Sequence, residues 1–435
     1  MSVIDIIDQK RRGRTHTREE IFALCEAMMQ GRAADYQIAA WLMAACLRGL
    51  NMDETVWLTE AFVASGRALD FSGIGGALVD KHATGGVGDK TTLALAPMLA
   101  ACGAKIAKLS GRGLGFTGGT IDKLEAIPGL NASLTADEMR AQVQRIGLAL
   151  SCQTEDLAPA DGKMYALRDV TATVDDIPLI TASVVSKKIA AGASVIALDI
   201  KAGRGAFAET REEAQALAKM CRDVGERLGK SFITVISSMD QPLGYAVGNA
   251  IEVTEAIQTL KGQGPADLTE LCLTLGAVTL AKAGLAPSAE AARERLQASL
   301  ADGSAYGKFV AMTAAQGGDV DALSDPALMP QPARVNMLPA WESGYVAAID
   351  PLLIAEAAKL VGAGRQTKES PIDPGAGVML FKKVGDPVEA GETLVELHVG
   401  HGAGDADALA RVRAAFTFSS TPVSPPPLIL EVVQG

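Results

Sequence analysis

Two short glycine-rich segments carry the residue types from which a phosphate site can be built. The segment Thr84–Lys90 reads Thr-Gly-Gly-Val-Gly-Asp-Lys, and the pattern Thr-Gly-Gly-x-x-Asp-Lys recurs at Thr117–Lys123. Paired glycines let the backbone turn and bring its N–H groups close to an anion. Each segment also carries hydroxyl groups and precedes an expected helix, whose N-terminus favours negative charge. We therefore expect the two loops to converge on one phosphate-binding cavity.

Cationic side chains gather around these loops. They are Lys81, Lys90, Lys108, Arg112 and Lys123. Lys81 and His82 directly precede the first loop, where a lysine can supply a point charge to phosphate and a histidine would lie at the mouth of the site. The alternatives are a solvated lysine and a structural histidine, and the adjacent loops favour the functional interpretation.

A third set of polar residues has spacing that suits a planar ligand. Tyr165 and Arg168 are followed by Ser183 and Lys187, and the last two are four positions apart, so on a helix they share one face. A hydroxyl, an ammonium and a guanidinium on one wall match a ring that bears carbonyl acceptors. Taken without context, this spacing also fits a solvent-facing helix.

The elements that would position these residues alternate between strand and helix. Residues 77–80 and 105–109 are expected strands, separated by a helix over 89–102. This order predicts a right-handed parallel crossover. Both loops then leave the carboxyl ends of neighbouring strands, which is where open parallel sheets bind ligands. Residues 194–200 and 231–237 are further strands.

The chain is long enough for several domains, and the changes in composition and hydrophobic spacing along it predict three. We expect an all-α lobe at 1–70, onto which residues from about 160 to 192 pack. An α/β domain with a mixed, largely parallel sheet and flanking helices is expected at 71–159 and 193–334. A C-terminal, mainly β domain of α+β, barrel-sandwich-like type is expected at 335–435.

Local patterns identify some of the elements within these domains. Thr17 and Glu20 form a capping-box pattern. Residues 34–48 are apolar on most sides, which predicts a helix buried between subunits. The hairpin at 385–392 is typical of biotinyl or lipoyl carriers but lacks a suitable lysine at its tip, so we expect a structural sandwich.

Charge and composition exclude several classes of protein. A net charge of −11 over 435 residues argues against nucleic acid and anionic membranes as partners. No apolar run approaches the ~18 residues of a membrane-spanning helix, and the acidic N-terminus argues against a signal peptide. The six cysteines form no C-x-x-C pair, which is typical of reduced thiols in a cytoplasmic protein.

A resemblance to a known family follows from the longest of these motifs. The run from Ser110 to Glu125 resembles the signature of thymidine and pyrimidine-nucleoside phosphorylases, and the resemblance extends over 80–89, 158–188 and 241–249. It implies the reversible phosphorolysis of uridine, thymidine and deoxyuridine to free base and α-D-(deoxy)ribose 1-phosphate. It also implies inorganic phosphate as co-substrate, no organic cofactor, and a homodimer formed through the helical lobe.

The resemblance assigns roles to particular residues. Phosphate would contact Lys81, Ala83, Thr92, Lys108, Ser110 and Thr120, and the nucleoside would contact Tyr165, Arg168, Ser183 and Lys187. His82, Lys187 and Arg168 would be catalytic, with His82 between base and sugar. A monovalent cation, potassium, would be held at Gly88, Lys90, Leu243, Ala246 and Glu255. Lys90 is an unusual neighbour for a cation.

Two positions depart from the family pattern. Ala83 stands where a serine is usual, which removes one hydroxyl donor to phosphate, and Phe116 stands where a histidine is common. Lys108 favours the branch that accepts both uridine and thymidine over a thymidine-restricted enzyme. An enzyme similar to anthranilate phosphoribosyltransferase would need different residues after Lys81, and a non-catalytic homologue would not need to retain Lys81, Arg168 and Lys187.

Overall fold

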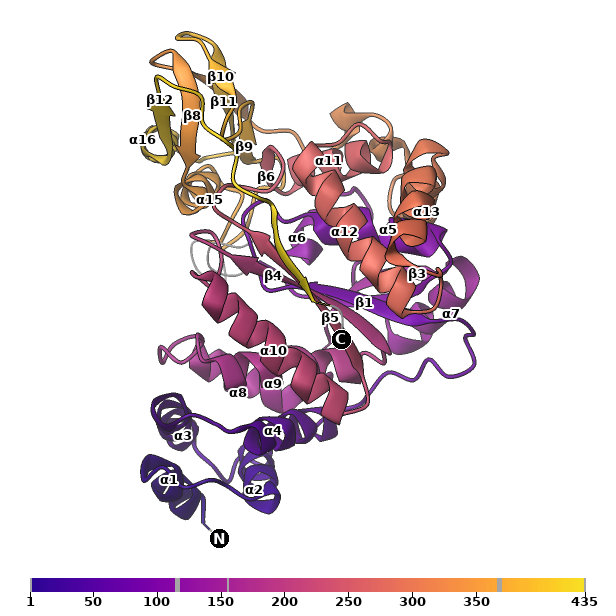
Figure 1. The fold of residues 1–435 in the computed structure, drawn as a ribbon, viewed down its shortest axis with the longest axis vertical. Coiled ribbons are helices and arrows are strands. Elements are labelled where there is room, and N and C mark those ends of the chain that lie inside the picture. The colour runs from indigo at the N-terminus through magenta and orange to yellow at the C-terminus, as the bar shows by residue number, and fades with distance from the viewer. Residues whose placement is uncertain (1, 114–117, 155, 366–369, 434–435) are drawn as a thin grey trace.

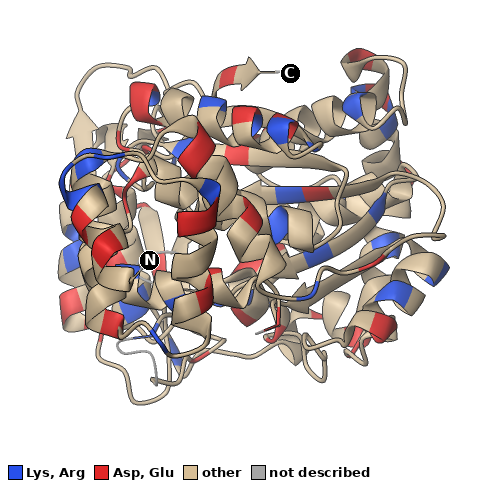
Figure 2. Ribbon diagram, turned by 90° about the horizontal axis from the view of Figure 1, so that it is seen from below, with Lys and Arg blue, Asp and Glu red and all other residues tan. Residues whose placement is uncertain are grey.

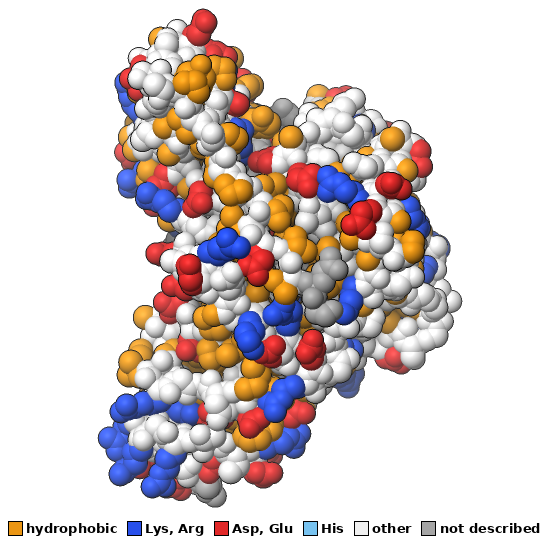
Figure 3. All heavy atoms as spheres, in the orientation of Figure 1, with side chains coloured by type: hydrophobic (Ala, Val, Ile, Leu, Met, Phe, Trp, Pro, Cys, Tyr) orange, Lys and Arg blue, Asp and Glu red, His pale blue; other side chains and the backbone are white. Residues whose placement is uncertain are grey.

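The molecule consists of three domains arranged along its long axis (Figure 1). The computed structural model describes residues 2–113, 118–154, 156–365 and 370–433. A helical lobe forms one end, an α/β domain forms the middle, and a β-rich domain forms the other end. Both end domains project to the same side of the central domain, so the outline of that side is concave (Figure 3).

The helical lobe combines the N-terminal helices with two helices from later in the chain. Its elements are α1 (Val3–Arg11), α2 (Arg18–Met29), α3 (Asp35–Arg48), α4 (Met52–Ala64), α8 (Pro159–Arg168) and α9 (Ile177–Ala190). Trp41 and Phe62 share one apolar core with Met164 from α8. The capping box expected at Thr17 is confirmed: its side chain accepts from the N–H of Glu20, whose carboxylate accepts from the N–H of Thr17 at 2.9 Å.

The α/β domain is built on a six-stranded sheet with the order β13-β5-β4-β1-β2-β3. Its strands are β1 (Leu78–Ala83), β2 (Lys105–Ser110), β3 (Leu148–Cys152), β4 (Val195–Ala202), β5 (Ser231–Ser238) and β13 (Ile429–Val433). The first five run parallel and β13 is antiparallel at the edge. The predicted parallel pairing is therefore confirmed: β1 and β2 are neighbours in the sheet, and α5 (Thr91–Ala101) lies between them in the sequence.

Helices cover both faces of this sheet (Figure 1). Besides α5 they are α6 (Thr120–Leu124), α7 (Ala136–Ile146), α10 (Arg211–Arg227), α11 (Ala250–Leu260), α12 (Ala266–Lys282), α13 (Ala289–Ala301) and α14 (Ser304–Ala315). Two 3₁₀ turns follow at Asp321–Leu323 and Pro326–Leu328. Nearly every residue of α5 is buried, which fits its largely apolar sequence between the sheet and α12.

The C-terminal domain exchanges strands with the α/β domain. Its own elements are β7 (Arg334–Pro339), β8 (Gly344–Ile349), α15 (Pro351–Leu360), β9 (Gly377–Leu380), β10 (Pro387–Val388), β11 (Thr393–Val399), α16 (Ala406–Ala415) and β12 (Phe416–Ser419). The short β6 (Ala246–Gly248) joins its sheet beside β9, whereas β13 returns to the central sheet beside β5. The expected boundary at residue 335 did not anticipate these strands, because short apolar segments do not specify their partner sheet.

The helical lobe and the α/β domain are joined where two chain segments cross closely. A Cβ atom on Gly66 would lie 2.1 Å from the carbonyl oxygen of Asp156, so the backbones meet there directly. The N–H of Arg67 donates to that carbonyl at 3.1 Å, and the N–H of Ala160 donates to Ser65 Oγ at 3.0 Å. These bonds hold the two segments together, and the helical lobe also packs on the α/β domain through an apolar core that joins Val56 and Val185 to Ile196 of β4.

The surface of the molecule mixes both signs of charge. Basic and acidic residues are interspersed over the helices when the molecule is seen from below (Figure 2). Among the helices that the structure describes, none combines the length and apolar character needed to cross a lipid bilayer.

Candidate active site

Lys81 lies near the carboxyl end of β1, at the start of the first glycine loop. Its side chain is only 4% exposed, and its Nζ lies 3.6 Å from Asp199 Oδ2 and 3.8 Å from Asp89 Oδ1. Neither distance is a hydrogen bond, and within the described residues the ammonium has no hydrogen-bond partner. A buried ammonium with unused donors is suited to hold an anion.

Further buried lysines surround Lys81 and share few carboxylates. Lys108 Nζ lies 3.5 Å and Lys188 Nζ 2.8 Å from opposite oxygens of Asp80. Burial is the main cause that lowers the pKa of Lys108 well below its ordinary value; Asp80 opposes this shift and the charge of Lys188 adds to it. A bound dianion would offset this crowding of positive charge, so the protein side of the site is complementary to phosphate.

The two glycine loops meet. Lys123, at the end of the second loop, donates from Nζ to the carbonyl oxygen of Asp89 in the first loop at 2.8 Å. Ser110 ends β2, Thr120 begins α6, and Thr92 lies in the first turn of α5. Each of these hydroxyl residues thus lies at the end of a strand or in the first turn of a helix. Residues 114–117, which include Phe116 and Thr117, lie outside the described residues.

Three cations expected near phosphate are already paired. Lys90 Nζ lies 2.5 Å from Glu255 Oε2, and Lys123 Nζ lies 2.6 Å from Glu252 Oε2. Arg112 donates to both carboxylate oxygens of Glu125, one of them at 2.7 Å. Their positive charges are neutralised by these partners, so they act as anchors of the loops, and Lys81 is the better candidate for contact with phosphate.

The side chains expected to bind the base lie together on α8 and α9. Lys187 Nζ donates to Ser183 Oγ at 3.2 Å, which confirms that the two share one helix face. The same ammonium lies 2.7 Å from Asp161 Oδ2 and 5.4 Å from the ring centroid of Tyr165. Lys187 is thereby held over the ring by a carboxylate and remains partly exposed.

Arg168 is fixed by main-chain oxygens. Its Nε, Nη1 and Nη2 donate to the carbonyls of Thr173, Leu179 and Val174 at 3.0, 3.2 and 2.5 Å. A guanidinium carries five N–H donors, so two remain for a ligand. The sequence predicted its place beside Tyr165, whose ring centroid is 5.6 Å from the guanidinium carbon, but not this backbone clamp.

His82 follows Lys81 on β1 and is half-buried. Burial, followed by the positive charges of Lys188 and Lys108, lowers its pKa well below the ordinary value. The imidazole is therefore neutral near pH 7 and carries one ring N–H donor. Ala83 comes next and ends the strand opposite Asp199.

The five positions expected to hold potassium are brought together, but a side chain occupies their centre. Lys90 Nζ donates to the carbonyls of Leu243 and Ala246 at 2.9 and 2.7 Å, in addition to Glu255. Gly88 packs on the same carbonyls, since a Cβ there would lie 2.7 Å from Leu243 O. These residues do not fit a separate potassium ion, because the ammonium already takes up the oxygens that would coordinate it.

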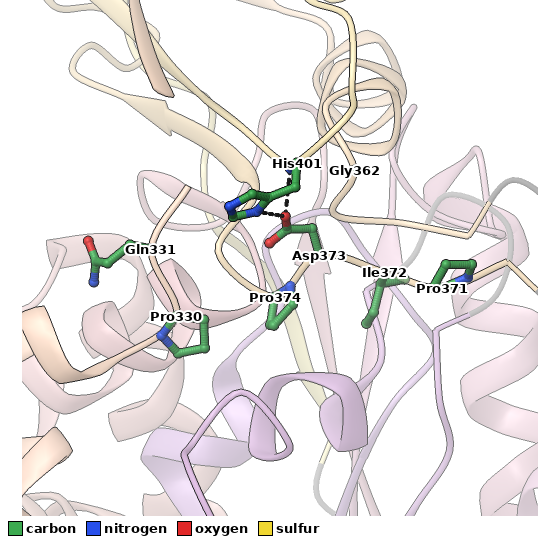
Figure 4. A pocket seen from close by; sticks show the side chains of 8 residues that line it. All are labelled: Pro330, Gln331, Gly362, Pro371, Ile372, Asp373, Pro374 and His401. Carbon is green, nitrogen blue, oxygen red and sulfur yellow. Dashed lines mark hydrogen bonds and ion pairs between the residues drawn. The ribbon is translucent and has the colours of Figure 1, made fainter. Parts of the chain in front are cut away.

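A cavity of about 580 Å³ lies elsewhere, against the C-terminal domain (Figure 4). Its lining includes Pro330, Pro371 and Pro374, and its polar contact joins His401 Nδ1 to Asp373 Oδ2 at 3.0 Å. Among the residues that the structure describes, neither a lysine nor an arginine lines it. An acidic, proline-lined hollow does not suit phosphate, so the reaction site is assigned to the lysine-rich strand ends instead.

Sequence reasoning missed the carboxylates that organise the lysines. Asp199 accepts from Ser237 Oγ at 2.7 Å and pairs with Lys201 at 2.7 Å, and Asp80 bridges two lysines. A signal was present: Lys201 directly follows the predicted strand 194–200, as Lys81 follows the strand at 77–80. Charged residues at the ends of buried strands mark a site in this type of sheet.

A helical lobe joined to an α/β domain that carries a site suited to phosphate is the architecture of one glycosyl transferase family. Residues 4–66 match the helical bundle domain of a glycosyl transferase family, and residues 75–306 match the a/b domain of that family. Residues 345–419 match the pyrimidine nucleoside phosphorylase C-terminal domain. The chain belongs to the pyrimidine-nucleoside phosphorylase family.

Curated relatives span the whole chain. It is 49% identical over 434 residues to the pyrimidine-nucleoside phosphorylase of Geobacillus stearothermophilus, covering 100% of both chains. It is 50% identical over 398 residues to that of Bacillus subtilis, covering 92% of both. Among solved structures, the anthranilate phosphoribosyltransferase of Thermus thermophilus matches 72% of this chain and 99% of its own, with a TM-score of 0.59 and 20% identity. This last likeness concerns the fold alone.

Proposed function

We propose that this protein catalyses the reversible phosphorolysis of pyrimidine nucleosides, with inorganic phosphate as co-substrate and no organic cofactor. The observation that carries the proposal is the buried ammonium of Lys81, whose donors are unused at the meeting point of the two glycine loops. The hydroxyl and cationic wall on α8 and α9 supports a pyrimidine ring as the other half of the substrate.

In the proposed reaction a phosphate oxygen bonds to the anomeric carbon of the nucleoside as the bond to the ring nitrogen breaks. The nitrogen keeps the electron pair and takes up a proton, and the products are the free base and α-D-(deoxy)ribose 1-phosphate. Arg168, Ser183 and Lys187 would donate to the carbonyl oxygens on which the negative charge develops. Preorganised donors of this kind are each worth about 2.7–4 kcal/mol in a transition state.

His82 would assist departure of the base as a neutral donor. Its lowered pKa keeps the free enzyme's imidazole uncharged, so its N–H can stabilise a carbonyl oxygen without adding to the crowd of lysines. A phosphate dianion bound beside it would offset the neighbouring positive charges and raise the pKa of His82, so that the imidazole can take up a proton from solvent and pass it to the nitrogen of the departing base.

The expected substrates are uridine, thymidine and deoxyuridine, and a thymidine-restricted enzyme is the alternative. The run Lys108-Leu109-Ser110 supports the broader range, because it resembles the branch of the family that accepts both uridine and thymidine. We also propose a homodimer formed through the helical lobe. Tyr36 and Leu47 of α3 are 76% and 75% exposed, and Met43 lies between them at helical spacing, so the outer face of this helix is apolar. The six cysteines are free thiols, which supports a cytoplasmic location.

The test is release of free base from each of the three nucleosides, with and without phosphate. We expect uracil and thymine to appear only with phosphate and in stoichiometric amounts with the pentose 1-phosphate. Release of thymine alone would support the restricted alternative. Release that requires phosphoribosyl pyrophosphate, or none at all, would overturn the proposal.

A further inference from the structure

The ammonium of Lys90 fills a complete oxygen cage beneath the first glycine loop. Its three N–H donors meet three acceptors: the carbonyls of Leu243 and Ala246, and Glu255 Oε2. The side chain is 1% exposed, so water does not share this coordination. Three oxygens with one negative charge among them form a hole for one positive charge.

The cage is held from outside by further bonds. Glu255 Oε1 accepts from the N–H of Tyr245 at 2.8 Å and of Ala246 at 3.2 Å, which fixes the carboxylate. The N–H of Leu243 donates to the carbonyl of Val87 at 3.0 Å, which ties the cage to the glycine loop. These bonds place the carboxylate and the carbonyls through contacts that do not involve Lys90.

The cage has no room for a second cation. A Cβ on Gly244 would lie 2.3 Å from Glu255 Oε2 and 3.1 Å from Lys90 Nζ, so the backbone closes over the ammonium. Burial disfavours the charged form of Lys90, but Glu255 and Glu252 outweigh burial and raise its pKa. The ammonium lies 2.5 Å from Glu255 Oε2, and it would repel any ion that approached the same oxygens.

The cage also lies at the junction of the first loop and the C-terminal domain. Lys383 Nζ donates to the carbonyl of Gly244 at 2.9 Å and pairs with Asp267 Oδ2 at 3.0 Å. Asp267 in turn accepts from the N–H of Gly244 at 3.0 Å. A charge at the centre of the cage therefore fixes the loop that carries Asp89 and Thr91 relative to two domains.

We propose that Lys90 is a tethered substitute for a dissociable monovalent cation, and that it makes the structure and activity of this protein independent of potassium. Lys90 then acts as a positioning residue: it holds the phosphate loop from behind and does not touch substrate. The kinetic part of this inference rests on the proposed function, whereas its binding and stability parts do not.

An ordinary buried salt bridge is the competing explanation, and it predicts a different response to truncation. If Lys90 only neutralises Glu255, its loss is a general destabilisation that every salt affects alike. If the oxygens form a cation hole, a short side chain leaves a site that a potassium or ammonium ion can fill and that choline, which is too large, cannot fill.

The experiment compares the wild type with Lys90→Ser in chloride salts of potassium, ammonium and choline at about 100 mM, where long-range charge effects are equally screened. We expect the thermal midpoint of the wild type to be the same in all three salts, and its phosphorolysis rate to agree within about twofold among them. For Lys90→Ser we expect a lower midpoint and a rate at least about tenfold lower in choline, with recovery of both in potassium or ammonium. Lys219→Ser, at an exposed lysine of α10, is the matched control and should respond to no salt.

Rubidium diffraction gives a readout that needs no activity. Crystals soaked in rubidium chloride should show an anomalous peak in the cage of Lys90→Ser and none there in the wild type. A rubidium peak in the wild-type cage, or potassium activation of the wild type by tenfold, would overturn the inference. A folded Lys90→Ser variant whose midpoint and rate are the same in all three salts would also overturn it. If that variant does not fold, the salt dependence and rubidium diffraction of the wild type still test the inference. Loss of phosphorolysis in every sample, with the rubidium and midpoint results as expected, would contradict the proposed function alone.

Discussion

The two Thr-Gly-Gly-x-x-Asp-Lys loops share a sequence but not a set of contacts. Each ends in a buried lysine that pairs with a glutamate of α11, Lys90 with Glu255 and Lys123 with Glu252. Those glutamates are three positions apart and lie on one helix face. The aspartates differ: Asp89 accepts from the N–H and Oγ1 of Thr91, whereas both carboxylate oxygens of Asp122 accept from Arg365 of the C-terminal domain.

This difference shows what the repeated pattern does. Both lysines fasten their loops to one acidic helix, so the backbones of the loops are brought to the same place. The positive charge that faces the site comes from Lys81, which lies outside both Thr-Gly-Gly-x-x-Asp-Lys segments. The comparison thus separates anchoring lysines, which should govern stability, from a facing lysine, which should govern phosphate binding.

The largest effect is expected from breaking the anchor of the second loop. In Lys123→Met the carboxylate of Glu252 stays buried without its cation, and breaking such a pair costs about 3–5 kcal/mol. The thermal midpoint should fall markedly, as measured by calorimetry. The double variant Lys123→Met with Glu252→Gln should recover part of the loss, and a midpoint equal to that of the wild type would show that Lys123 is not an anchor.

Removing the facing lysine should affect turnover more than folding. Lys81→Met deletes a donor to the phosphate, and kcat/KM for phosphate should fall roughly 100- to 1,000-fold. The fold should be retained, because Asp199 keeps Lys201 and Asp89 keeps Thr91. If the loss of Lys81 lowered the midpoint as much as the loss of Lys123 and left kcat/KM unchanged, the distinction between the two lysines would fail.

A gain of function is expected at the end of β1. Ala83→Ser adds a hydroxyl beside the first loop, and a hydrogen bond to a charged group is worth about 1.5–3 kcal/mol. The KM for phosphate should fall by roughly tenfold. Ala83→Cys, which is similar in size but a weak donor, should change it little. An unchanged KM in the serine variant would contradict a side-chain contact at this position.

The smallest effect concerns pH. The pKa of His82 is lowered in the fold, so below pH ~6.5 the unfolded chain takes up a proton that the folded site resists, and stability falls as the pH falls. The loss is at most about 1.4 kcal/mol per pH unit. Thermal midpoints from pH 7.5 to 5.5 without phosphate should decline less in His82→Gln, and identical slopes would mean that His82 titrates normally.

The local elements were accessible from sequence because their signals are local. The strands at β1 and β2, the helix at α3 and the capping box at Thr17 follow from hydrophobic period and side-chain chemistry. The pairing of Ser183 with Lys187 follows from helical spacing. The resemblance of 110–125 to a known signature placed the phosphate and base residues in one enzyme family.

What sequence could not give are contacts between distant segments. Glu252 and Glu255 are ordinary acidic residues until the fold sets them against Lys123 and Lys90, and nothing in the local pattern names those partners. The backbone clamp on Arg168 likewise depends on how α8 meets α9. The return of β13 to the central sheet is a long-range pairing of a short strand, which no periodicity specifies.

The most direct test of the account is a crystal structure of the protein soaked in phosphate at millimolar concentration. We expect one phosphate whose oxygens contact Lys81 Nζ together with Ser110 and Thr120, between the two glycine loops. Phosphate bound only at another place, or none bound at all, would contradict it.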